Sequence, residues 1–522
     1  MGFFGTIMKI IMIIVVAALT ICVILGAILM IFPTVSIFGL HYVSSSYGEE
    51  QAEYLRTTEN SQMWEDADSI RIETGGYDIV VRVKETGQNG ETYQDGTYAS
   101  VVNSSYKGFV WGGDAYKPTY SSSISENKYL EENGNNVFYV RMAEPGGFLI
   151  RSQTLLTLIV ESGTFENKNL EINTKGGSVT IGGDVNLSEK QIRLKNLDIN
   201  AGTGKVSLQN ITVSDTLNIS KYSGDVVAQT NLTANTELSI VGGYGIIDLK
   251  DVGQISSESK LKITTTNTHT TIGKIYGDFE FKADGGLLET GEITKDVDLD
   301  VKSCDCRLGN LNSTLNVVGG DGYLKIPKVA GNVTITMNNG ETTIFETNGE
   351  VVFESQKGSL TLSKAQKSVT ATTVYGNIDI VCDGVFPLDI NNKHGSTKFV
   401  NAKDIVNINA SNTIDNKGTG NITGTFAEIN GESSIFGYAG NVEITVPQNE
   451  WLLSWRNVSG KVDIKLGSLI TDKKTTSEFL NDTSQNNKWI DVMSKQQAEE
   501  SESPNRLLIT NNSGKIQILA GI

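Results

Sequence analysis

Proline, aromatic residues, histidine and cysteine are all scarce in this sequence. The 522 residues include 7 prolines, 3 histidines and 4 cysteines, and aromatic residues make up 7% of the chain. So few aromatic side chains fit the thick core of a large globular domain poorly, whereas thin repeating layers need few of them. Glycine, by contrast, is abundant, with 54 residues. The composition therefore favours one long, turn-rich repeat array over several globular domains.

Basic residues are also outnumbered. The chain has 43 Lys and Arg against 60 Asp and Glu, which gives a formal net charge of −17. An acidic surface repels the phosphates of nucleic acids, so we expect no nucleic-acid partner.

A short pattern returns about every 18 residues between Thr268 and Asn412, with one extra residue before Gly395. Within each repeat two segments alternate apolar and polar residues, as Leu360 and Leu362 do in one of them. Such alternation is typical of strands with one buried face, and a strand pair this short must stack on its neighbours to bury that face. We therefore predict an all-β fold, a β-solenoid with coils of about 18 residues.

An almost unbroken apolar run from Ile7 to Phe32 precedes the repeats. It is long enough to span a bilayer and longer than the apolar core of a cleavable signal peptide. Lys9 lies before the run and the next basic residue after it is Arg56, which predicts a cytoplasmic N-terminus. The sequence thus predicts a single-pass cell-membrane protein with its repeats outside the cell.

The domain organisation that we expect has four parts. Residues 1–35 form a signal-anchor transmembrane helix, and residues 36–68 a polar stalk that is partly helical near Glu49 to Glu59. Residues 69–162 form a β cap that carries a Tyr-, Gly- and Ser-rich insertion at 85–136. Residues 163–522 form the solenoid, with a polar insertion at 468–505, and residues 507–521 supply its closing coil.

The insertion at 85–136 is the candidate recognition loop, because tyrosine among small polar residues is typical of binding surfaces. Its candidate contact residues are Tyr93, Tyr98, Tyr106, Trp111, Tyr116 and Tyr120. An ordinary structural loop would have a similar composition.

Catalytic, cofactor and metal sites are not expected. His269 and His394 lie about seven repeats apart, roughly 34 Å at the usual strand spacing, so they cannot share a metal or a proton. Cys304 and Cys306 face the same way in one strand and are interpreted as buried apolar residues, with Cys382 several repeats further on. No nucleotide-binding, hydrolase or zinc-peptidase motif is present.

Three stretches, INTKGGSVTIGG from Ile172, VEITVPQNEWLLSWRNVSGKVDI from Val442 and LLITNNSGKIQIL from Leu507, share a strand, a glycine turn and a second strand. In these stretches the chain, from Ser69 onward, resembles a bacterial family of unknown function labelled putative adhesins. The resemblance implies a Gly-rich β-solenoid at or outside the cell membrane.

The function expected from the sequence is therefore non-enzymatic surface adhesion or envelope structure, with the membrane and a cell-surface protein or glycan as partners. Two alternatives stay open. A self-assembling, bactofilin-like scaffold would need an uncapped terminal coil. A carbohydrate-cleaving β-helix would need carboxylates and arginines gathered on adjacent coils. Asp296, Asp298 and Asp300 do share one outward strand face, but a solvated face that discourages edge pairing explains them better.

Overall fold

The computed structural model describes most of the chain. The described residues are 2–32, 36–37, 39–45, 49–56, 61–83, 97–111, 119–132, 134–143, 148–161, 163–182, 191–254, 259–410, 418–449, 451–466, 490–491 and 504–521. They are mostly β-strand, with one long apolar helix at the N-terminus. The chain divides into two compact units, Met1–Thr233 and Ala234–Ile522.

Helix α1 (Gly2–Ile31) contains the apolar run expected from the sequence. Its segment Ile7–Ile31 has a mean hydropathy of 3.1. The helix therefore has the length and composition of a membrane span or a signal sequence.

An antiparallel group of strands follows α1 in the first unit. Strand β5 (Thr97–Trp111) pairs with β1 (Leu40–Ser45) and β2 (Glu49–Arg56) along one edge and with β9 (Phe148–Val160) along the other. The prediction of a partly helical stalk near Glu49 is wrong. Residues 49–56 form β2, and among the described residues nearby only α2 (Ser61–Glu65) is helical. Backbone pairing with β5 overrides the helix propensity of Glu, Gln, Ala and Leu in this segment.

Two parallel ladders adjoin this group in the first unit. One ladder runs in the order β8 (Asn135–Ala143), β3 (Ser69–Thr74), β10 (Asn169–Thr174), β13 (Asn196–Asn200) and β16 (Thr216–Ser223). The other runs β9, β4 (Asp78–Val83), β11 (Val179–Ile181), β14 (Val206–Leu208) and β17 (Val226–Ala228). Strands β12 (Ile192–Leu194) and β15 (Ile211–Val213) pair beside them. The first repeat of the chain, β3 and β4, therefore lies between two later ones.

The free edge of β8 is covered in the same way as that of β9. Strands β6 (Thr119–Ser122) and β7 (Leu130–Glu132) pair antiparallel with β8, and the short helix α3 (Ser123–Glu126) follows β6. The segment 85–136 thus contributes β5, β6, α3 and β7 to the fold, and its residues 85–96, 112–118 and 133 lie outside the described residues.

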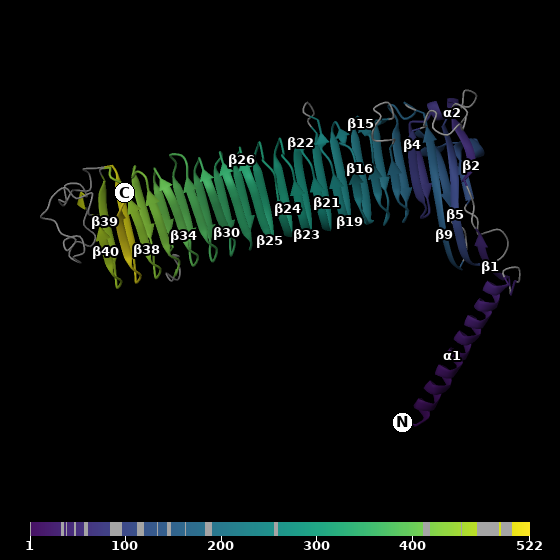
Figure 1. The fold of residues 1–522 in the computed structure, drawn as a ribbon, viewed down its shortest axis with the longest axis horizontal. Helices are drawn as coiled ribbons and strands as arrows, with labels where there is room; N and C mark the ends of the chain where they lie inside the picture. The colour runs from purple at the N-terminus through teal and green to yellow at the C-terminus, as the bar shows by residue number, and fades with distance from the viewer. Residues whose placement is uncertain are drawn as a thin grey trace. The chain divides into compact units, whose positions relative to one another are not determined.

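The second unit repeats a parallel pairing, and from β21 (Lys260–Ile272) to β32 (Ile378–Cys382) the paired residues lie 18 positions apart, as Lys260 and Asp278 or Leu360 and Ile378 do. It opens with the long strands β19 (Glu237–Leu249), β21 (Lys260–Ile272), β23 (Asp278–Thr290) and β24 (Val297–Arg307), with β20 (Val252–Gly253) and β22 (Ile275–Tyr276) between them. Strands β23 and β24 lie side by side (Figure 1), and Phe279 pairs with Val297, the residue 18 positions later. The expected slip is confirmed, because Val369 pairs with Leu388.

Two ladders continue from β24. The first consists of β25 (Leu315–Asp321), β27 (Val333–Met337), β29 (Val351–Ser355), β31 (Val369–Thr373), β33 (Leu388–Asn392), β35 (Val406–Asn409) and β37 (Glu432–Phe436). The second consists of β26 (Tyr323–Val329), β28 (Glu341–Thr347), β30 (Ser359–Ala365), β32 (Ile378–Cys382), β34 (Thr397–Ala402), β36 (Ile422–Phe426) and β38 (Val442–Val446).

The last repeat of the chain is not the last in space. Strand β42 (Arg506–Asn511) pairs with β37 on one side and β39 (Leu452–Asn457) on the other, and β43 (Ile516–Ala520) lies likewise between β38 and β40 (Val462–Lys465). The expectation that residues 507–521 close the array is therefore wrong. Of the segment 468–505, only 490–491 and 504–505 lie within the described residues, and β41 (Ile490–Asp491) pairs antiparallel with β39.

Burial alternates along each strand, so every second side chain points inward and stacks on the paired side chains of the neighbouring strands. These stacks of inward side chains, the inward columns, form the core. Ile335 and Leu362 are 0% and 1% exposed, as their columns predict. The thiols of Cys304, Cys306 and Cys382 are buried and free, which agrees with their interpretation as core residues.

Candidate functional site

An open hollow on the surface of the first unit is the best candidate for a binding site. It has a volume of about 600 Å³, and its polar lining includes Glu73, Arg141, Asn173, Lys175 and Asn200. Four of these residues lie side by side because parallel pairing aligns Arg141 on β8, Glu73 on β3, Asn173 on β10 and Asn200 on β13. We call such a set of paired residues across adjacent strands a rung. This rung presents two charged side chains and two amide side chains in a row.

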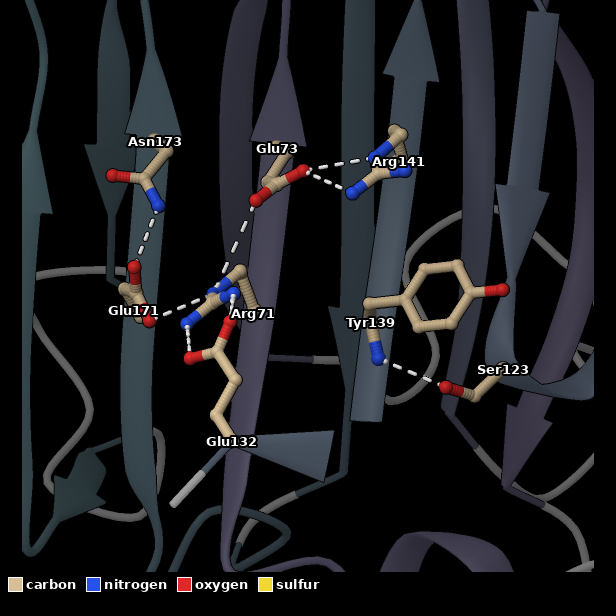
Figure 2. Close-up of polar contacts among 8 residues, drawn as sticks. All are labelled: Arg71, Glu73, Ser123, Glu132, Tyr139, Arg141, Glu171 and Asn173. Carbon is tan, nitrogen blue, oxygen red and sulfur yellow. Dashed lines mark hydrogen bonds and ion pairs between the residues drawn. The ribbon is translucent and has the colours of Figure 1, made fainter. Parts of the chain in front are cut away.

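Arg71 on β3 lies at the centre of an ion-pair network beside the hollow (Figure 2). Its guanidinium binds both carboxylate oxygens of Glu132, with Nη1 2.6 Å from Oε1, and its Nε donates to Glu171 at 2.8 Å. Asn173 donates to the other oxygen of Glu171 at 2.7 Å. The side chain of Arg71 is 14% exposed, whereas those of Glu132 and Glu171 are 47% and 34% exposed, so the cation is shielded from water and its two carboxylate partners are not.

A second ion pair joins the network to the rim of the hollow. Arg141 donates from Nε to Glu73 at 2.8 Å, and its guanidinium lies 5.7 Å from the centre of the Tyr139 ring. Tyr139 is held in turn by its backbone N–H, which donates to the buried hydroxyl of Ser123 at 3.0 Å (Figure 2). The orientation of Arg141 therefore depends on β3, β8 and α3 together.

The pKa shifts show that this network is strongly ionic. The hydrogen bonds to Glu132 raise the pKa of Arg71 above its usual value, and the same contact lowers the pKa of Glu132. A general acid for glycoside cleavage needs a carboxyl pKa that is raised instead. Glu132 is thus suited to holding Arg71 and unsuited to donating a proton at neutral pH.

None of the four expected recognition residues that the structure describes lines this hollow. Tyr98, Tyr106 and Trp111 lie on β5 and Tyr120 on β6, whereas Tyr93 and Tyr116 lie outside the described residues. The hydroxyl of Tyr120 donates to Glu53 at 3.2 Å, and its pKa is raised by burial first and by Glu53 second. Tyr120 therefore makes a contact within the fold.

The carboxylates that share an outward face in the second unit are bonded to neighbouring repeats. Asp300 forms an ion pair of 2.6 Å with Lys282, and Asp296 accepts from Ser313 and Thr314. The hydroxyl of Ser313 is the main cause of the lowered pKa of Asp296. Among the described residues, no group of three or more His, Cys, Asp or Glu is arranged to hold a metal.

Sequence reasoning missed the Arg71 network because its members come from distant segments. Arg71 and Glu171 are 100 positions apart, and Arg71 and Glu132 are 61 apart. The outward positions of the strands SIRIE and VFYVRM carry the only local signal, namely charges that alternate with apolar residues. Which strands become neighbours cannot be seen in that pattern.

Comparisons with known proteins add little. No family model and no curated protein matches the chain. Among solved structures, the crystal structure of a putative cell adhesion protein from Clostridium sporogenes matches over 92% of this chain and 100% of that one, with 8% identity and a TM-score of 0.12. Its name agrees in general terms with the adhesin-like resemblance of the sequence, but a likeness this weak carries no argument.

Replacing Arg71 tests whether the network stabilises the first unit. We expect Arg71→Met to lower the free energy of unfolding by about 1 kcal/mol, because it removes the charge-assisted hydrogen bonds to the partly exposed carboxylates of Glu132 and Glu171. The loss should shrink as the pH falls below the ordinary glutamate value of 4.5, since the depressed pKa of Glu132 stabilises the fold only while its carboxyl is ionised. Urea unfolding at several pH values measures this, and an equal loss at pH 3 and pH 7 would contradict it.

Proposed function

We propose that this chain is a membrane-anchored β-solenoid that acts outside the cell by binding or by supporting the envelope, without catalysis. The observation that carries the proposal is the parallel pairing at a constant offset of 18 residues, as between Leu315 and Val333, in a chain that begins with one apolar helix. A stack of such repeats is a stiff support, and α1 would attach it to the membrane.

The hollow at β3, β8, β10 and β13 is the proposed binding surface. Its rung of Arg141, Glu73, Asn173 and Asn200 offers donors and acceptors in a row, and Lys175 adds an exposed cation. Hydroxyl groups of a glycan both donate and accept, so they match a rung that mixes guanidinium, carboxylate and amide groups. We therefore propose a surface glycan as the ligand, with a cell-surface protein as the alternative.

Substitution at the hollow tests this binding. We expect the full-length protein, reconstituted in nanodiscs, to bind members of a glycan array, and Asn200→Ala to weaken that binding at least ~5-fold through loss of a hydrogen-bonding amide. Lys325→Ala in the second unit, at an exposed position, is the matched control and should bind like the wild type. Array binding that Asn200→Ala leaves unchanged would place recognition elsewhere on the molecule.

The direction of insertion can be tested separately. If α1 anchors the chain with its N-terminus in the cytoplasm, protease added to intact cells should remove the repeats and leave a membrane-bound stub. An epitope at each terminus makes both fragments visible on a blot. A C-terminal epitope that survives in intact cells and disappears only after lysis would refute the extracellular orientation.

The recognition role of the segment 85–136 stays a prediction. Replacing the whole segment by a linker would remove β5 from β9 and β6 and β7 from β8, so a loss of binding would not separate recognition from folding. Point substitutions at Tyr93 and Tyr116 are the better test.

The two alternative functions have less support. End-to-end assembly needs open strand edges, and β41 covers part of the edge of β39. Carboxylates and arginines do gather on adjacent repeats around Arg71, as a glycoside hydrolase would require, but the lowered pKa of Glu132 argues against an acid catalyst there.

A further inference from the structure

Another polar hollow lies on the second unit, over β25. It has a volume of about 500 Å³, and three adjacent strands and the turn after them supply its polar lining: Asp300, Lys302, Asp321, Asn338 and Asn339. Among the described residues, none lines both this hollow and the hollow of the first unit. A hollow of this volume is large enough for a small ligand.

Two glycines keep the middle of this hollow open. Strand β25 carries Gly319 and Gly320 and lies between β24 and β27. A Cβ on Gly320 would lie 2.3 Å from the carbonyl oxygen of Lys302, so the stacked backbones leave no room for a side chain there. The flanking strands are two strand spacings apart, roughly 10 Å. The space between their side chains is therefore a fixed feature of the stack.

The charged side chains of β24 are held on the side away from these glycines. Asp300 forms an ion pair of 2.6 Å with Lys282, and Lys302 forms one of 2.6 Å with Asp284. Lys282 and Asp284 belong to β23, which pairs with the edge of β24 opposite to β25. The ion pairs thus direct both side chains towards β23 and away from the hollow. Both side chains remain exposed, so each can make a further hydrogen bond.

The opposite wall and the end of the hollow present polar groups with unused hydrogen-bonding capacity. Asn339 donates from Nδ2 to Oδ1 of Asp321 at 2.6 Å, which orients this carboxylate. The other oxygen of Asp321 has no partner in the part of the chain that the structure describes. Asn338 is exposed, and none of the described residues hydrogen-bonds its side-chain amide. Its backbone N–H donates to the carbonyl of Gly319 at 3.2 Å, so the wall is tied to the floor.

The charge of the hollow restricts the ligand that it can take. Together with the partners in the ion pairs, two lysines and three aspartates leave one net negative charge. An anionic ligand is therefore disfavoured. A carboxylate oxygen accepts from a hydroxyl, and an amide both donates and accepts, so Asp321 and Asn338 suit neighbouring hydroxyl groups of one ligand. Val318, which is 52% exposed, adds an apolar contact to the lining.

We propose that this hollow binds an uncharged sugar unit of a glycan. The inference rests on the proposed glycan binding and adds a site in the second unit. Asp321 and Asn338 hold neighbouring hydroxyls of the sugar, and Val318 contacts the apolar C–H groups of its ring. The site is built before the ligand arrives, because the glycines of β25 and the ion pairs of β24 keep it open.

Photo-crosslinking in the full-length protein, reconstituted in nanodiscs, tests this site. The probes are short oligosaccharides of glucose, galactose, mannose and N-acetylglucosamine, each with a diazirine at the reducing end. Mass spectrometry of the digested protein then identifies the labelled peptides. We expect label within residues 297–339, which contain the hollow. Label in the first unit alone would overturn this site and leave the proposed glycan binding intact, whereas no label from any probe would refute both.

Substitutions separate specific binding from labelling of any exposed surface. Asp321→Asn and Asn338→Ala should each reduce the label at 297–339 at least ~5-fold through loss of a hydrogen bond to the sugar, with the label in the first unit unchanged. Asp321→Asn keeps an oxygen that can accept from Asn339, so the fold is preserved. Asp389→Asn, the same change at an exposed position on β33, is the matched control and should label like the wild type. Equal labelling of all three variants would overturn the site.

Competition tests the preference for an uncharged sugar. An unlabelled galactose oligosaccharide should reduce the label at 297–339 at a concentration at least ~5-fold lower than its galacturonic acid counterpart, because the hollow already carries a net negative charge. Equal competition by the two would contradict the assignment of an uncharged ligand.

Discussion

Ile335→Ala is expected to lower the free energy of unfolding by about 2 to 5 kcal/mol. Ile335 is 0% exposed on β27, where it pairs with Val317 on one side and Phe353 on the other. Truncation to alanine removes buried methyl and methylene groups, and the repeats on both sides hold the resulting cavity open. Thermal unfolding followed by circular dichroism measures the loss.

Lys325→Ala is the matched control for this substitution. Lys325 lies on β26 in an outward, exposed position, so its truncation should cost under about 0.5 kcal/mol. The two variants therefore compare one inward and one outward column of neighbouring strands. Similar losses for both would mean that the inward and outward columns are wrongly assigned.

The columns could be predicted from the sequence because they depend only on local spacing. An alternation such as Leu360, Leu362 defines the buried face of one strand, and the 18-residue offset pairs it with the next, as the pairing of Leu362 with Ile380 shows. The slip before Gly395 was visible for the same reason. Every one of these relations joins segments that follow each other along the chain.

The order of the outermost repeats could not be predicted in this way. Strand β3 pairs with β8, which lies 68 residues further on, and with β10, which lies 100 residues further on. Likewise β42 inserts between two earlier strands, β37 and β39. A repeat pattern states which face of a strand is buried but not which other repeat covers it, because every repeat presents a similar apolar face. The ion pairs of Arg71 depend on that order, so they could not be predicted from the sequence either.

At one turn of each repeat, here called the corner, a glycine contacts the glycine of the adjacent repeat. These contacts follow the order of the repeats in space. A Cβ on Gly376 would lie 1.7 Å from the carbonyl oxygen of Gly358, and one on Gly395 would lie 1.7 Å from that of Gly376. The same contact links Gly514 to Gly440 and then Gly460 to Gly514, which repeats the inserted order of β42 and β43. Each backbone thus sits directly on the one before it, at a distance that excludes any side chain.

Gly376→Ala should therefore be among the most damaging single substitutions in the chain, with an expected loss of about 3 kcal/mol or more. Its methyl group would collide with a carbonyl of the neighbouring backbone, which cannot rotate away as a side chain can. Two hydrogen bonds also hold the backbone of Gly376 in place. The hydroxyl of Thr373 accepts from the N–H of Gly376 at 3.2 Å, and buried Asn392 donates to the carbonyl of Gly376 at 3.0 Å. Any shift that makes room for the methyl group breaks these bonds as well.

Gly242→Ala separates this steric effect from the general effect of replacing glycine. Gly242 lies in β19 of the same unit, and a Cβ there would meet nothing within 4 Å. Alanine restricts the unfolded chain more than glycine does, so this variant should be neutral or more stable by up to about 1 kcal/mol. Thermal unfolding of the two variants side by side gives the comparison. Equal unfolding temperatures for Gly376→Ala and Gly242→Ala would contradict the close contact between Gly376 and the carbonyl group of the neighbouring repeat.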